Sequence, residues 1–575
     1  MNKLRSIWRH FQDGWQIAKP FWIYSRYKLS AFFLLLLVGL SLASIEVLSY
    51  FAKWNGEFYN SLQEYNFKLF IHLLYTFGWI LLVYLVIALV MALARKYIEL
   101  TWRTYLTEYY QQMWLHQHNH YKFTILPNQT IDNPDQRISD DINGFIILSL
   151  DFVLGLIRSV FMLIVFIPML WKLSGIYNFN LWGHNYHITG FMLYILVLYV
   201  GIATIIQIWL GRPLIKLSYN QQAYEADFRY SLIRLRENSE NISLYHGENK
   251  ENQHLKNKMS KIISNNYAML YRQIKLDIFG FSYGQINSIF PILVMAPQYF
   301  AKKITLGTMM QTQYAFSRVL DSLSFVINIY SGTLVGLRVI MDRLLEFQQM
   351  VDSANDLELN DRLNRIEIED RIPLVINNLQ IFTPHYDLLL EVAKLEVRAG
   401  KHVLISGQSG SGKTTLFKVL SAMWPYANGD IITSSSIGYF FVSQRSYLAI
   451  DSIYNILTYP HLKCDYDENK IKQLLTEFNL AKLIDKLHIV NNYMIELSLG
   501  EIQRLMIIRV IIYAPDVVFL DEATSAMDYP AKHIAYHALY QYLPSCTIVS
   551  ISHDTDIAQY HTDFYKIEKG RLYGT

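Results

Sequence analysis

Cysteine and charged residues are both scarce in this sequence of 575 residues. Two cysteines, Cys464 and Cys546, are too few for a disulfide-stapled scaffold or a cysteine-based zinc site. Charged residues make up 17% of the chain, against roughly 25% in a soluble domain. Together with 52% hydrophobic residues this excludes intrinsic disorder, and a net charge of +3 gives no reason to expect nucleic acid as a partner. The mean hydropathy of +0.15 is too low for a chain embedded in a membrane throughout, so it predicts apolar and polar parts.

The long apolar runs lie in the N-terminal part of the chain. Residues 31–51, 72–94, 146–170 and 188–210 are each long enough to cross about 30 Å of hydrocarbon as a helix. Two weaker candidates, 278–300 and 315–340, are interrupted by polar residues, so hydropathy alone leaves them open. Lysine and arginine precede the first run and follow the second and fourth, which places both termini in the cytoplasm and requires an even number of spans.

The segments around these runs carry further expectations. Residues 1–30 do not end in a cleavage site and predict an amphipathic elbow on the membrane surface, whose lipid-facing aromatic residues are Trp8, Phe11, Trp15, Phe21 and Trp22. A basic tail that merely orients the first span is the alternative. The loops after the second and fourth spans are long and helix-like, so the membrane helices should continue into the cytoplasm.

A glycine-rich loop lies between a strand-like and a helix-like run in the C-terminal part. Residues 403–406 form the strand-like run, Gly407-Gln408-Ser409-Gly410-Ser411-Gly412-Lys413-Thr414 follows, and 416–420 read as a helix. The glycines and the start of the helix present N–H groups to phosphate oxygens. We therefore expect Lys413 to reach the β- and γ-phosphates of a nucleotide and the Thr414 hydroxyl to bind Mg²⁺.

Further apolar runs end in residues suited to phosphoryl transfer. Residues 517–520 predict a buried parallel strand, so Asp521 should lie at its carboxyl end and hold Mg²⁺, while Glu522 orients and deprotonates the attacking water. His553 follows the run 547–551, and we favour contact with the γ-phosphate over an ordinary surface histidine. Gln444 follows the run 438–442 and by itself indicates little.

A second anion site is predicted where Leu497-Ser498-Leu499-Gly500-Glu501 introduces a helix. Ser498 can cap this helix, and Gly500 permits a close approach of the backbone to a phosphate. A lone sequence of this kind is an ordinary capped helix. The other motifs of the same domain favour the anion site.

The order of these motifs resembles the nucleotide-binding domain of ABC transporters. Gly407 to Thr414 is similar to the Walker A loop, Gln444 to the Q-loop glutamine, 497–501 to the signature, Asp521 and Glu522 to the Walker B aspartate and catalytic glutamate, 525–528 to the D-loop and His553 to the switch histidine. The signature departs from the common Leu-Ser-Gly-Gly-Gln at Leu499 and Glu501. This variant, and segments 54–63, 133–138, 225–230 and 237–248, resemble the peroxisomal-type subfamily D half-transporters and their bacterial relatives.

The resemblance covers nearly the whole chain and implies its architecture. It implies a membrane protein with a six-helix, exporter-type (type IV) transmembrane domain and an α/β P-loop nucleotide-binding domain. The implied parts are an elbow at 1–30, the transmembrane domain at 31–345, a linker at 346–364 and the ATP-binding cassette at 365–575. It also implies a homodimer in which each ATP lies between the Walker A loop of one copy and the signature of the other.

The resemblance assigns roles to individual residues. Those implied to bind ATP are Gly407, Ser409, Gly410, Ser411, Gly412, Lys413, Thr414, Thr415, Gln444, Ser498, Gly500, Glu501 and Asp528. Glu522 and His553 are catalytic in this scheme, and Thr414, Gln444 and Asp521 hold Mg²⁺. An aromatic residue upstream of the loop, Phe382 or Tyr386, is expected to stack on adenine.

Polar side chains within the predicted spans are candidates for a substrate cavity, because such residues in membranes are usually functional. They are Glu46, Asp151, Arg158, Gln207, Gln285, Asn287, Asp321 and Asn328. Asp151 and Arg158 are seven residues apart on one helical face, so a structural ion pair is the alternative for them.

A polar cavity would suit a hydrophilic cargo. The resemblance implies import of a solute such as cobalamin or peptides, or transport of fatty acyl-CoA as in the peroxisomal members, and the lack of an organelle signal favours a bacterial inner membrane. An exporter of drugs, lipids or peptides is the alternative, because ATP hydrolysis does not encode direction. The membrane spans argue against a non-transport ABC ATPase.

Overall fold

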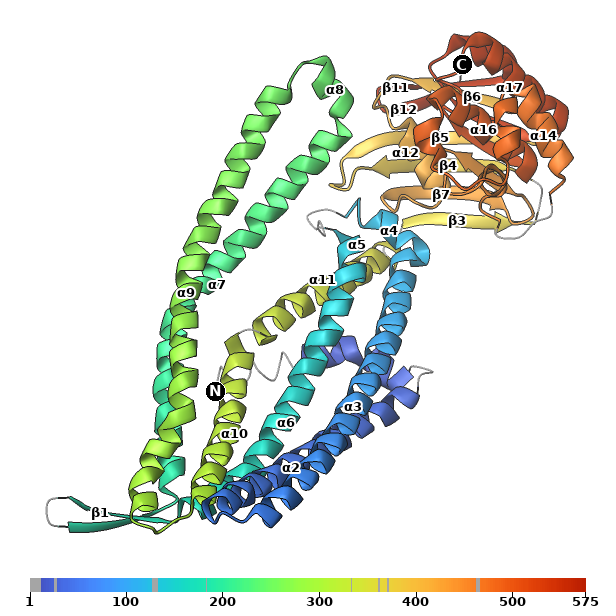
Figure 1. The fold of residues 1–575 in the computed structure, drawn as a ribbon. Coiled ribbons are helices and arrows are strands. Elements are labelled where there is room, and N and C mark those ends of the chain that lie inside the picture. The colour runs from blue at the N-terminus through green and yellow to red at the C-terminus, as the bar shows by residue number, and fades with distance from the viewer. Residues whose placement is uncertain are drawn as a thin grey trace. The chain divides into compact units, whose positions relative to one another are not determined.

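The chain forms two compact units in a computed structural model (Figure 1). The first unit is Met1–Tyr110 with Asn133–Leu345, and the second is Gln111–Asp132 with Glu346–Thr575. The structure describes residues 12–24, 28–126, 133–181, 184–331, 333–359, 362–369, 372–461 and 466–574.

Long helices dominate the first unit. They are α2 (Leu29–Gln63), α3 (Phe67–Leu115), α6 (Ile142–Ser174), α7 (Phe191–Glu237), α9 (Glu248–Phe300), α10 (Leu306–Ser331) and α11 (Thr333–Leu359), of which α3 and α11 continue into the second unit. Shorter helices and one hairpin connect them: η1 (Pro20–Tyr24), η2 (His116–His118), α4 (Asn119–Lys122), α5 (Pro134–Gln136), η3 (Arg137–Asp141), α8 (Ser239–Leu244), β1 (Ile176–Leu181) and β2 (His184–Thr189).

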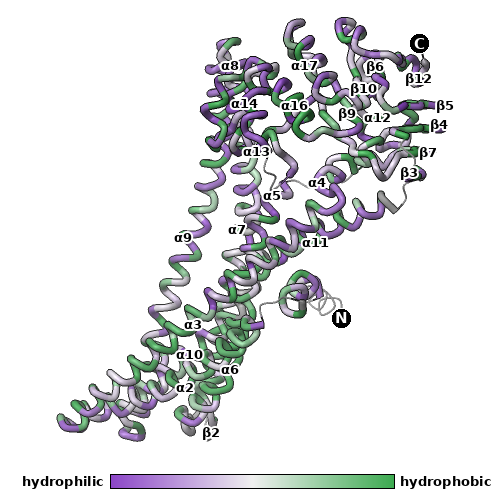
Figure 2. The backbone as a smooth tube through the Cα atoms, turned by 90° about the vertical axis from the view of Figure 1, so that its right-hand side faces the viewer, coloured by the Kyte–Doolittle hydropathy of each residue, from purple (hydrophilic) through white to green (hydrophobic). Residues whose placement is uncertain are grey.

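Helices of the predicted spans are long and apolar enough to cross a membrane. By length and composition, five helices of the described part qualify: Leu29–Gln63, Phe67–Lys122, Pro134–Ser174, Phe191–Glu237 and Glu248–Phe300. At 1.5 Å per residue, α7 and α9 are about 70 and 80 Å long, far more than about 30 Å of hydrocarbon requires. Figure 2 shows hydrophobic residues gathered at the ends of α7 and α9 away from α8, and hydrophilic residues toward α8. These lengths are compatible with the prediction that the helices continue beyond the membrane.

Helix α10 is not among these five, and it packs against α2, α6, α7 and α9. The last predicted span began at 315, whereas α10 begins at Leu306. The cause is a cap supplied by α2: the Gln63 side chain accepts from the Leu306 N–H at 2.7 Å and the Asn60 side chain from the Gly307 N–H at 2.9 Å. Hydropathy could not reveal this start, because the cap comes from a segment 243 residues away in the sequence.

Gly307 brings α10 unusually close to α2. A Cβ at this position would lie 2.0 Å from the Gly56 carbonyl oxygen and 2.5 Å from Asn60 Oδ1. We expect Gly307→Ala to push the two helices apart and to lower the Tm of the detergent-solubilised protein by several degrees, because overpacking costs about 1–3 kcal/mol. The matched control is Gly39→Ala in α2, where nothing lies within 4 Å of the new Cβ. An unchanged Tm for Gly307→Ala would contradict this contact.

The prediction that the aromatic residues of the elbow face lipid is wrong for Phe21 and stays a prediction for Trp15. Trp15 is 51% exposed, but Phe21 is 2% exposed and stacks on Trp102 of α3 with ring centroids 5.5 Å apart. Trp22 meets the same Trp102 ring edge-on at 5.3 Å. The aromatic surface of α3 offers these rings a protein partner in place of lipid. Trp8 and Phe11 lie outside the described residues.

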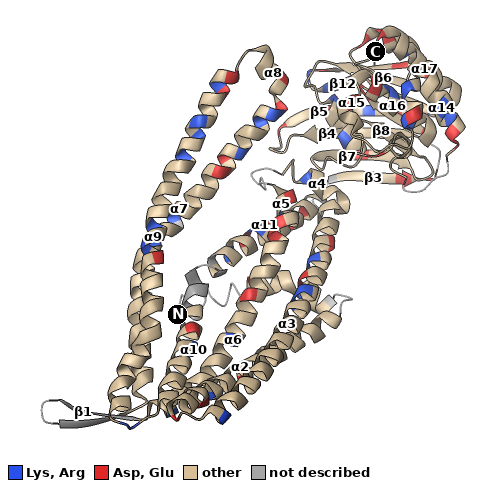
Figure 3. Cartoon of the chain, in the orientation of Figure 1, with Lys and Arg blue, Asp and Glu red and all other residues tan. Residues whose placement is uncertain are grey.

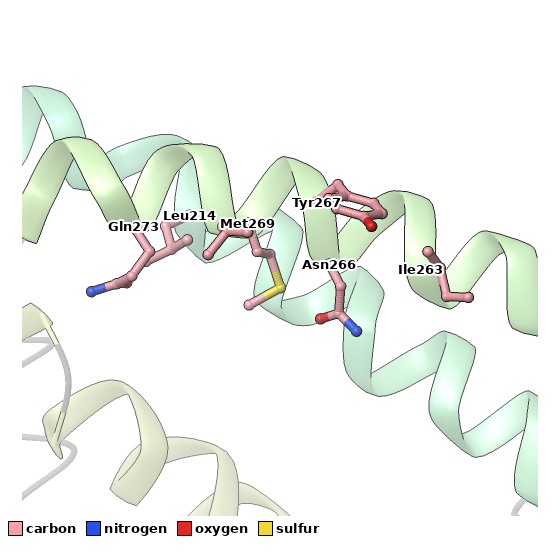
Figure 4. A pocket seen from close by; sticks show the side chains of 7 residues that line it. Leu214, Ile263, Asn266, Tyr267, Met269 and Gln273 are labelled. Atoms are coloured by element: carbon pink, nitrogen blue, oxygen red, sulfur yellow. The ribbon is translucent and has the colours of Figure 1, made fainter.

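A buried amide fixes the pairing of α7 with α9. Asn265 of α9 donates to the Leu217 carbonyl and to Gln221 Oε1 of α7, both at 2.9 Å. Beside this contact a hollow of about 620 Å³ opens between the two helices, with Leu214 on α7 and Met269 on α9 among its walls (Figure 4). The hydrogen bonds of Asn265 therefore set the register of α7 against α9 beside this hollow.

A ten-stranded sheet forms the frame of the second unit, in the order β3-β7-β4-β5-β12-β11-β6-β10-β9-β8. Its strands are β3 (Arg362–Ile368), β4 (Leu374–Phe382), β5 (Leu388–Val397), β6 (His402–Gly407), β7 (Ala427–Ser434), β8 (Tyr439–Val442), β9 (Val517–Asp521), β10 (Thr547–Ile551), β11 (Asp563–Glu568) and β12 (Arg571–Gly574). β6, β10, β9 and β8 are successive parallel neighbours, so their carboxyl ends share one edge of the sheet.

Helices cover this sheet and complete two hydrophobic cores. They are α12 (Lys413–Leu420), α13 (Ile453–Thr458), α14 (Glu468–Glu477), η4 (Ala481–Lys486), α15 (Tyr493–Glu496), α16 (Leu499–Tyr513), α17 (Tyr529–Tyr542) and η5 (Thr555–Tyr560). Phe417 of α12 packs edge-on against Phe519 of β9 with ring centroids 5.2 Å apart. The stretch predicted as a linker is helical up to Leu359, and β3 begins at Arg362.

The turn that follows α3 packs within the second unit. The Tyr426 hydroxyl donates to the Ile125 carbonyl at 3.3 Å, and the Lys418 ammonium lies 5.4 Å from the centre of the Tyr121 ring. Phe123 meets Phe347 edge-on at 5.5 Å. Residues 111–126 therefore lie between two long helices in sequence, yet pack with the sheet unit.

Candidate functional site

The four parallel strands place the predicted motifs at one edge of the sheet. The phosphate loop (residues 407–414) follows β6, Asp521 ends β9 and Glu522 follows it, His553 comes after β10, and Gln444 comes after β8. Chain segments that are far apart in sequence therefore meet at the edge where parallel sheets bind ligands.

The phosphate loop closes around its own lysine. The Lys413 ammonium donates to the Gly407 and Gln408 carbonyls at 2.7 and 2.8 Å. Burial lowers the pKa of Lys413, while the Glu522 and Asp521 carboxylates act in the opposite direction. Gly412, before the first residue of α12, has φ +93°, which a residue with a Cβ rarely adopts.

One buried oxygen of this loop suits a phosphate ligand. Ser411 Oγ is buried and has no hydrogen-bond partner within the described part of the chain. Leaving a buried hydroxyl unsatisfied is costly, so the loop is complete when an acceptor joins it. Together with the N–H groups at the start of α12, this hydroxyl fits the phosphates of ATP.

Lys413, Gln444, Glu522 and His553 come together in front of this loop. Lys413 Nζ lies 2.9 Å from His553 Nε2, and because an ammonium carries donors alone, the imidazole nitrogen accepts. The same Nε2 lies 3.7 Å from Glu522 Oε1, and Gln444 Nε2 donates to Glu522 Oε2 at 2.6 Å. The side chains predicted to surround the γ-phosphate thus form one connected group.

Asp521 and Thr414 form the predicted metal side of the site. The Thr414 hydroxyl donates to the Asp521 carboxylate, which is 3% exposed. Burial raises the pKa of Asp521 and the neighbouring Glu522 adds to this, whereas the Thr414 hydrogen bond and Lys413 oppose it. Hydroxyl, carboxylate and amide oxygens are the donors that Mg²⁺ prefers, so Thr414, Gln444 and Asp521 fit this ion.

Gln503 holds the backbone around Glu522 in place. Glu522 has φ +47°, an uncommon value for a residue with a side chain. Gln503, which is 1% exposed in α16, donates to the Glu522 carbonyl at 3.3 Å and to Ser525 Oγ at 3.2 Å, and accepts from the Ala526 N–H at 2.9 Å. Gln503 was assigned no role from the sequence. The signal that could have identified it is an amide within a largely apolar helix.

The signature begins helix α16 as predicted. Ser498 Oγ accepts from the Glu501 N–H and Glu501 Oε2 accepts from the Ser498 N–H at 2.9 Å, which is a complete capping box. Glu501 also pairs with Lys482 at 2.6 Å. Burial raises the pKa of Glu501, but the hydrogen bonds from Lys482 and Ser498 outweigh it, and the pKa lies below its usual range. Gly500 lies in the first turn of α16, and Asp528 caps α17 by accepting from the Ala531 N–H at 3.0 Å.

The two candidates for adenine stacking differ in exposure. Phe382 ends β4 and is half-buried, and its carbonyl accepts from Trp424 Nε1 at 3.0 Å. Tyr386 lies in the following turn, is 69% exposed and meets Tyr426 edge-on at 5.7 Å. An exposed ring is available to a base.

The polar residues of the membrane spans do not form one cluster of contacts. Figure 3 shows that charged residues are sparse along the apolar stretches of α2, α6 and α10. Glu46, Arg158, Gln207 and Gln285 are exposed, and the Asn328 side chain lies outside the described residues. Asn287 donates to Ser317 Oγ at 3.3 Å, and Asp321 lies 3.8 Å from Arg318.

The alternative considered for Asp151, an ion pair with Arg158, is wrong. Asp151 Oδ1 lies 2.7 Å from the Arg95 guanidinium of α3. Two helical turns separate Asp151 from Arg158, which is too far for a close pair along one helix. The Asp151 carboxylate therefore pairs with Arg95 of the neighbouring helix α3.

Comparison with known proteins agrees with this geometry. The chain matches family models for the ABC transporter transmembrane region 2 at residues 21–300 and for the ABC transporter at residues 390–525. An ABC transporter ATP-binding protein of Haemophilus influenzae is 31% identical over 93% of this chain and 89% of its own length. The inner membrane ABC transporter ATP-binding protein YddA of Escherichia coli is 29% identical over 94% of both chains.

More distant relatives agree with the predicted subgroup and fold. Human ATP-binding cassette sub-family D member 3 is 25% identical over 82% of this chain and 75% of its own. The solved structure of a bacterial Atm1-family ABC exporter with ATP bound superposes with a TM-score of 0.70, at 16% identity, over 95% of this chain and 94% of that one. These matches confirm the exporter fold and ATP hydrolysis coupled to transport. The chain belongs to the ABC transporter family, as a half-transporter with one transmembrane region and one ATPase domain.

Proposed function

We propose that two copies of this chain form a transporter in a bacterial inner membrane and hydrolyse ATP at two composite sites. The observation that supports this most directly is the group of Lys413, Gln444, Glu522 and His553, which can surround one face of a triphosphate. The signature lies at the surface, where Leu499 is 55% exposed, so a second copy can supply it to the other face. The name of the Escherichia coli relative supports the inner membrane.

Catalysis in this proposal rests on side chains already in place. Lys413 exchanges its contacts with the loop carbonyls and His553 for phosphate oxygens, and Ser411 gains the partner that it lacks. Glu522 takes the proton of the attacking water, while Gln444 and His553 orient its carboxylate. Thr414, Gln444 and Asp521 would hold Mg²⁺, which supplies positive charge to the phosphates.

The turn between α3 and α6 gives a route from ATPase to membrane. Residues 111–126 pack with the ATPase domain through Tyr121, Phe123 and Ile125. A movement of the domain on ATP binding or release would therefore displace the ends of two membrane helices. Tyr386 is the side chain that we propose stacks on adenine, because it is the more exposed aromatic residue.

For the cargo, we propose import of a hydrophilic solute such as cobalamin or a peptide. Polar side chains on α7, α9 and α10 support a polar path. Export of drugs, lipids or peptides is the second candidate, and the likeness to the fold of a solved exporter favours it.

Transport direction can be tested in proteoliposomes, because ATP added outside energises only those molecules whose ATPase domain faces outward. Vesicles are loaded with labelled cobalamin or a labelled proline-rich peptide, and Mg²⁺ and ATP are added outside. Import into the cytoplasm then appears as ATP-dependent loss of label from the lumen. Accumulation of external label in the lumen would show export. Movement of a lipophilic dye with neither cobalamin nor peptide moving would overturn the proposed cargo.

A further inference from the structure

We propose that Arg318 of α10 is the centre of a site that binds a monoanionic group on an aromatic or other flat apolar solute. This inference rests on the proposed transport function and specifies its cargo by chemistry. Arg318 was not among the residues predicted to line the substrate cavity, so this site adds a residue to that set.

The six-span architecture expected from the sequence places Arg318 deep within the membrane-spanning part. It follows the start of α10 at Leu306 by twelve residues, which is about 18 Å along the helix. That start is capped by the end of α2, next to the tight turn that joins the spans α2 and α3. The hydrocarbon core is about 30 Å thick, so Arg318 is near its middle. A guanidinium at this depth is costly and marks a functional site or a strong structural pair.

The Tyr314 ring lies beside the guanidinium, and rings of two other helices back it to form an aromatic wall. Its central carbon is 4.7 Å from the centre of the Tyr314 ring on the same helix. Tyr314 in turn contacts Phe51 of α2 at 5.3 Å and Phe166 of α6 at 6.3 Å between ring centroids. These rings stabilise the cation but provide no anionic oxygen.

The pairing of Arg318 with Asp321 is incomplete. Arg318 Nη1 and Asp321 Oδ2 are 3.8 Å apart, beyond the range of a hydrogen bond, and the Asp321 side chain is 63% exposed. A satisfied pair in the same unit, Arg95 with Asp151, is 2.7 Å apart. A purely structural pair should close in the same way.

Two buried polar atoms, one on α9 and one on α10, also lack partners among the described residues. Within the described residues, neither Arg318 Nε nor Asn287 Oδ1 has a hydrogen-bond partner, although both are buried. Asn287 Nδ2 donates to Ser317, the neighbour of Arg318 in the chain. The site therefore offers an unused donor on a planar cation and an unused acceptor close by.

These features select one class of ligand. A guanidinium binds carboxylate, sulfonate or phosphate oxygens through parallel hydrogen bonds, and the aromatic wall suits a flat apolar group. Asp321 would repel a second negative charge, which favours a monoanion. The ligand is thus an anion with an aromatic or apolar body, held between α2, α6, α9 and α10.

Two fluorescent probes that differ by one sulfonate test this site. 1-Anilinonaphthalene-8-sulfonate carries the anion, and N-phenyl-1-naphthylamine has the same rings without it. Binding is measured without nucleotide, with the full-length protein in nanodiscs of neutral phosphatidylcholine. We expect Arg318→Gln to weaken the affinity for the sulfonate probe at least tenfold. The affinity for the neutral probe should stay unchanged. Arg318→Lys should retain part of the affinity, and Asp321→Asn should strengthen it.

Matched variants separate this inference from folding and from ATP hydrolysis. Arg338→Gln is the control, because Arg338 also lies 3.7 Å from an aspartate one turn away, in α11. Glu522→Gln should bind the sulfonate like wild type, so a failure of the catalytic proposal leaves this test intact. Wild-type binding of the sulfonate by Arg318→Gln, or equal loss of both probes, would overturn the site. If Arg318→Gln does not fold, unchanged binding in both Arg318→Lys and Asp321→Asn overturns it.

Discussion

Glu522→Gln should reduce ATP turnover by about 10²–10⁴-fold and leave ATP binding intact. Glutamine has the same shape as glutamate and can still accept from Gln444 through its side-chain oxygen, so the group around the phosphate loop should persist. It cannot take a proton from the attacking water. Phosphate release measures turnover, and titration with a fluorescent ATP analogue measures binding.

The control for this variant is Glu396→Gln in β5. Glu396 pairs with Arg398 at 3.0 Å at the surface, so its loss should leave both turnover and binding unchanged. Wild-type turnover in Glu522→Gln would show that another group accepts the proton. Loss of binding together with turnover would show that Glu522 maintains the shape of the site, in keeping with its strained backbone.

The ATPase motifs could be predicted from the sequence because each depends on local order. An apolar run that leads into Asp521 and Glu522, or into the glycine loop, specifies a strand and the functional residues at its carboxyl end. Parallel strands then bring those ends together, whatever the distance along the chain. This is how Gln444, placed by little more than a run of apolar residues, comes to lie 2.6 Å from Glu522.

The contacts that the sequence could not show are between residues of distant segments. Residues 54–63 were recognised only as a family resemblance. In the structure Trp54 donates to the Leu73 carbonyl of α3 at 2.8 Å, and Asn60 and Gln63 cap α10. Phe21 was assigned to lipid, and Asp151 to a substrate cavity or to a local partner, because periodicity describes one helix at a time. Their actual partners, Trp102 and Arg95, both lie on α3.

Lys413→Met should lower ATP affinity by roughly a hundredfold, since two hydrogen bonds from a charged group contribute about 1.5 kcal/mol or more each. Methionine retains the buried stem of Lys413, which is 6% exposed, but removes the ammonium that holds the Gly407 and Gln408 carbonyls and faces the phosphates. Turnover should fall with affinity, in contrast to Glu522→Gln, where turnover alone should fall. The same titration with the fluorescent ATP analogue measures the effect.

Lys418→Met in the same helix is the matched control for Lys413→Met. The Lys418 ammonium lies over the Tyr121 and Trp424 rings, at 5.4 and 5.8 Å from their centres. Its loss should leave ATP affinity within about twofold of wild type, because a partly exposed cation one turn along contributes little. Equal losses of affinity in both variants would mean that the general positive charge of α12 attracts the nucleotide. A loss confined to Lys413→Met would instead show that affinity depends on the position of the Lys413 ammonium within the phosphate loop.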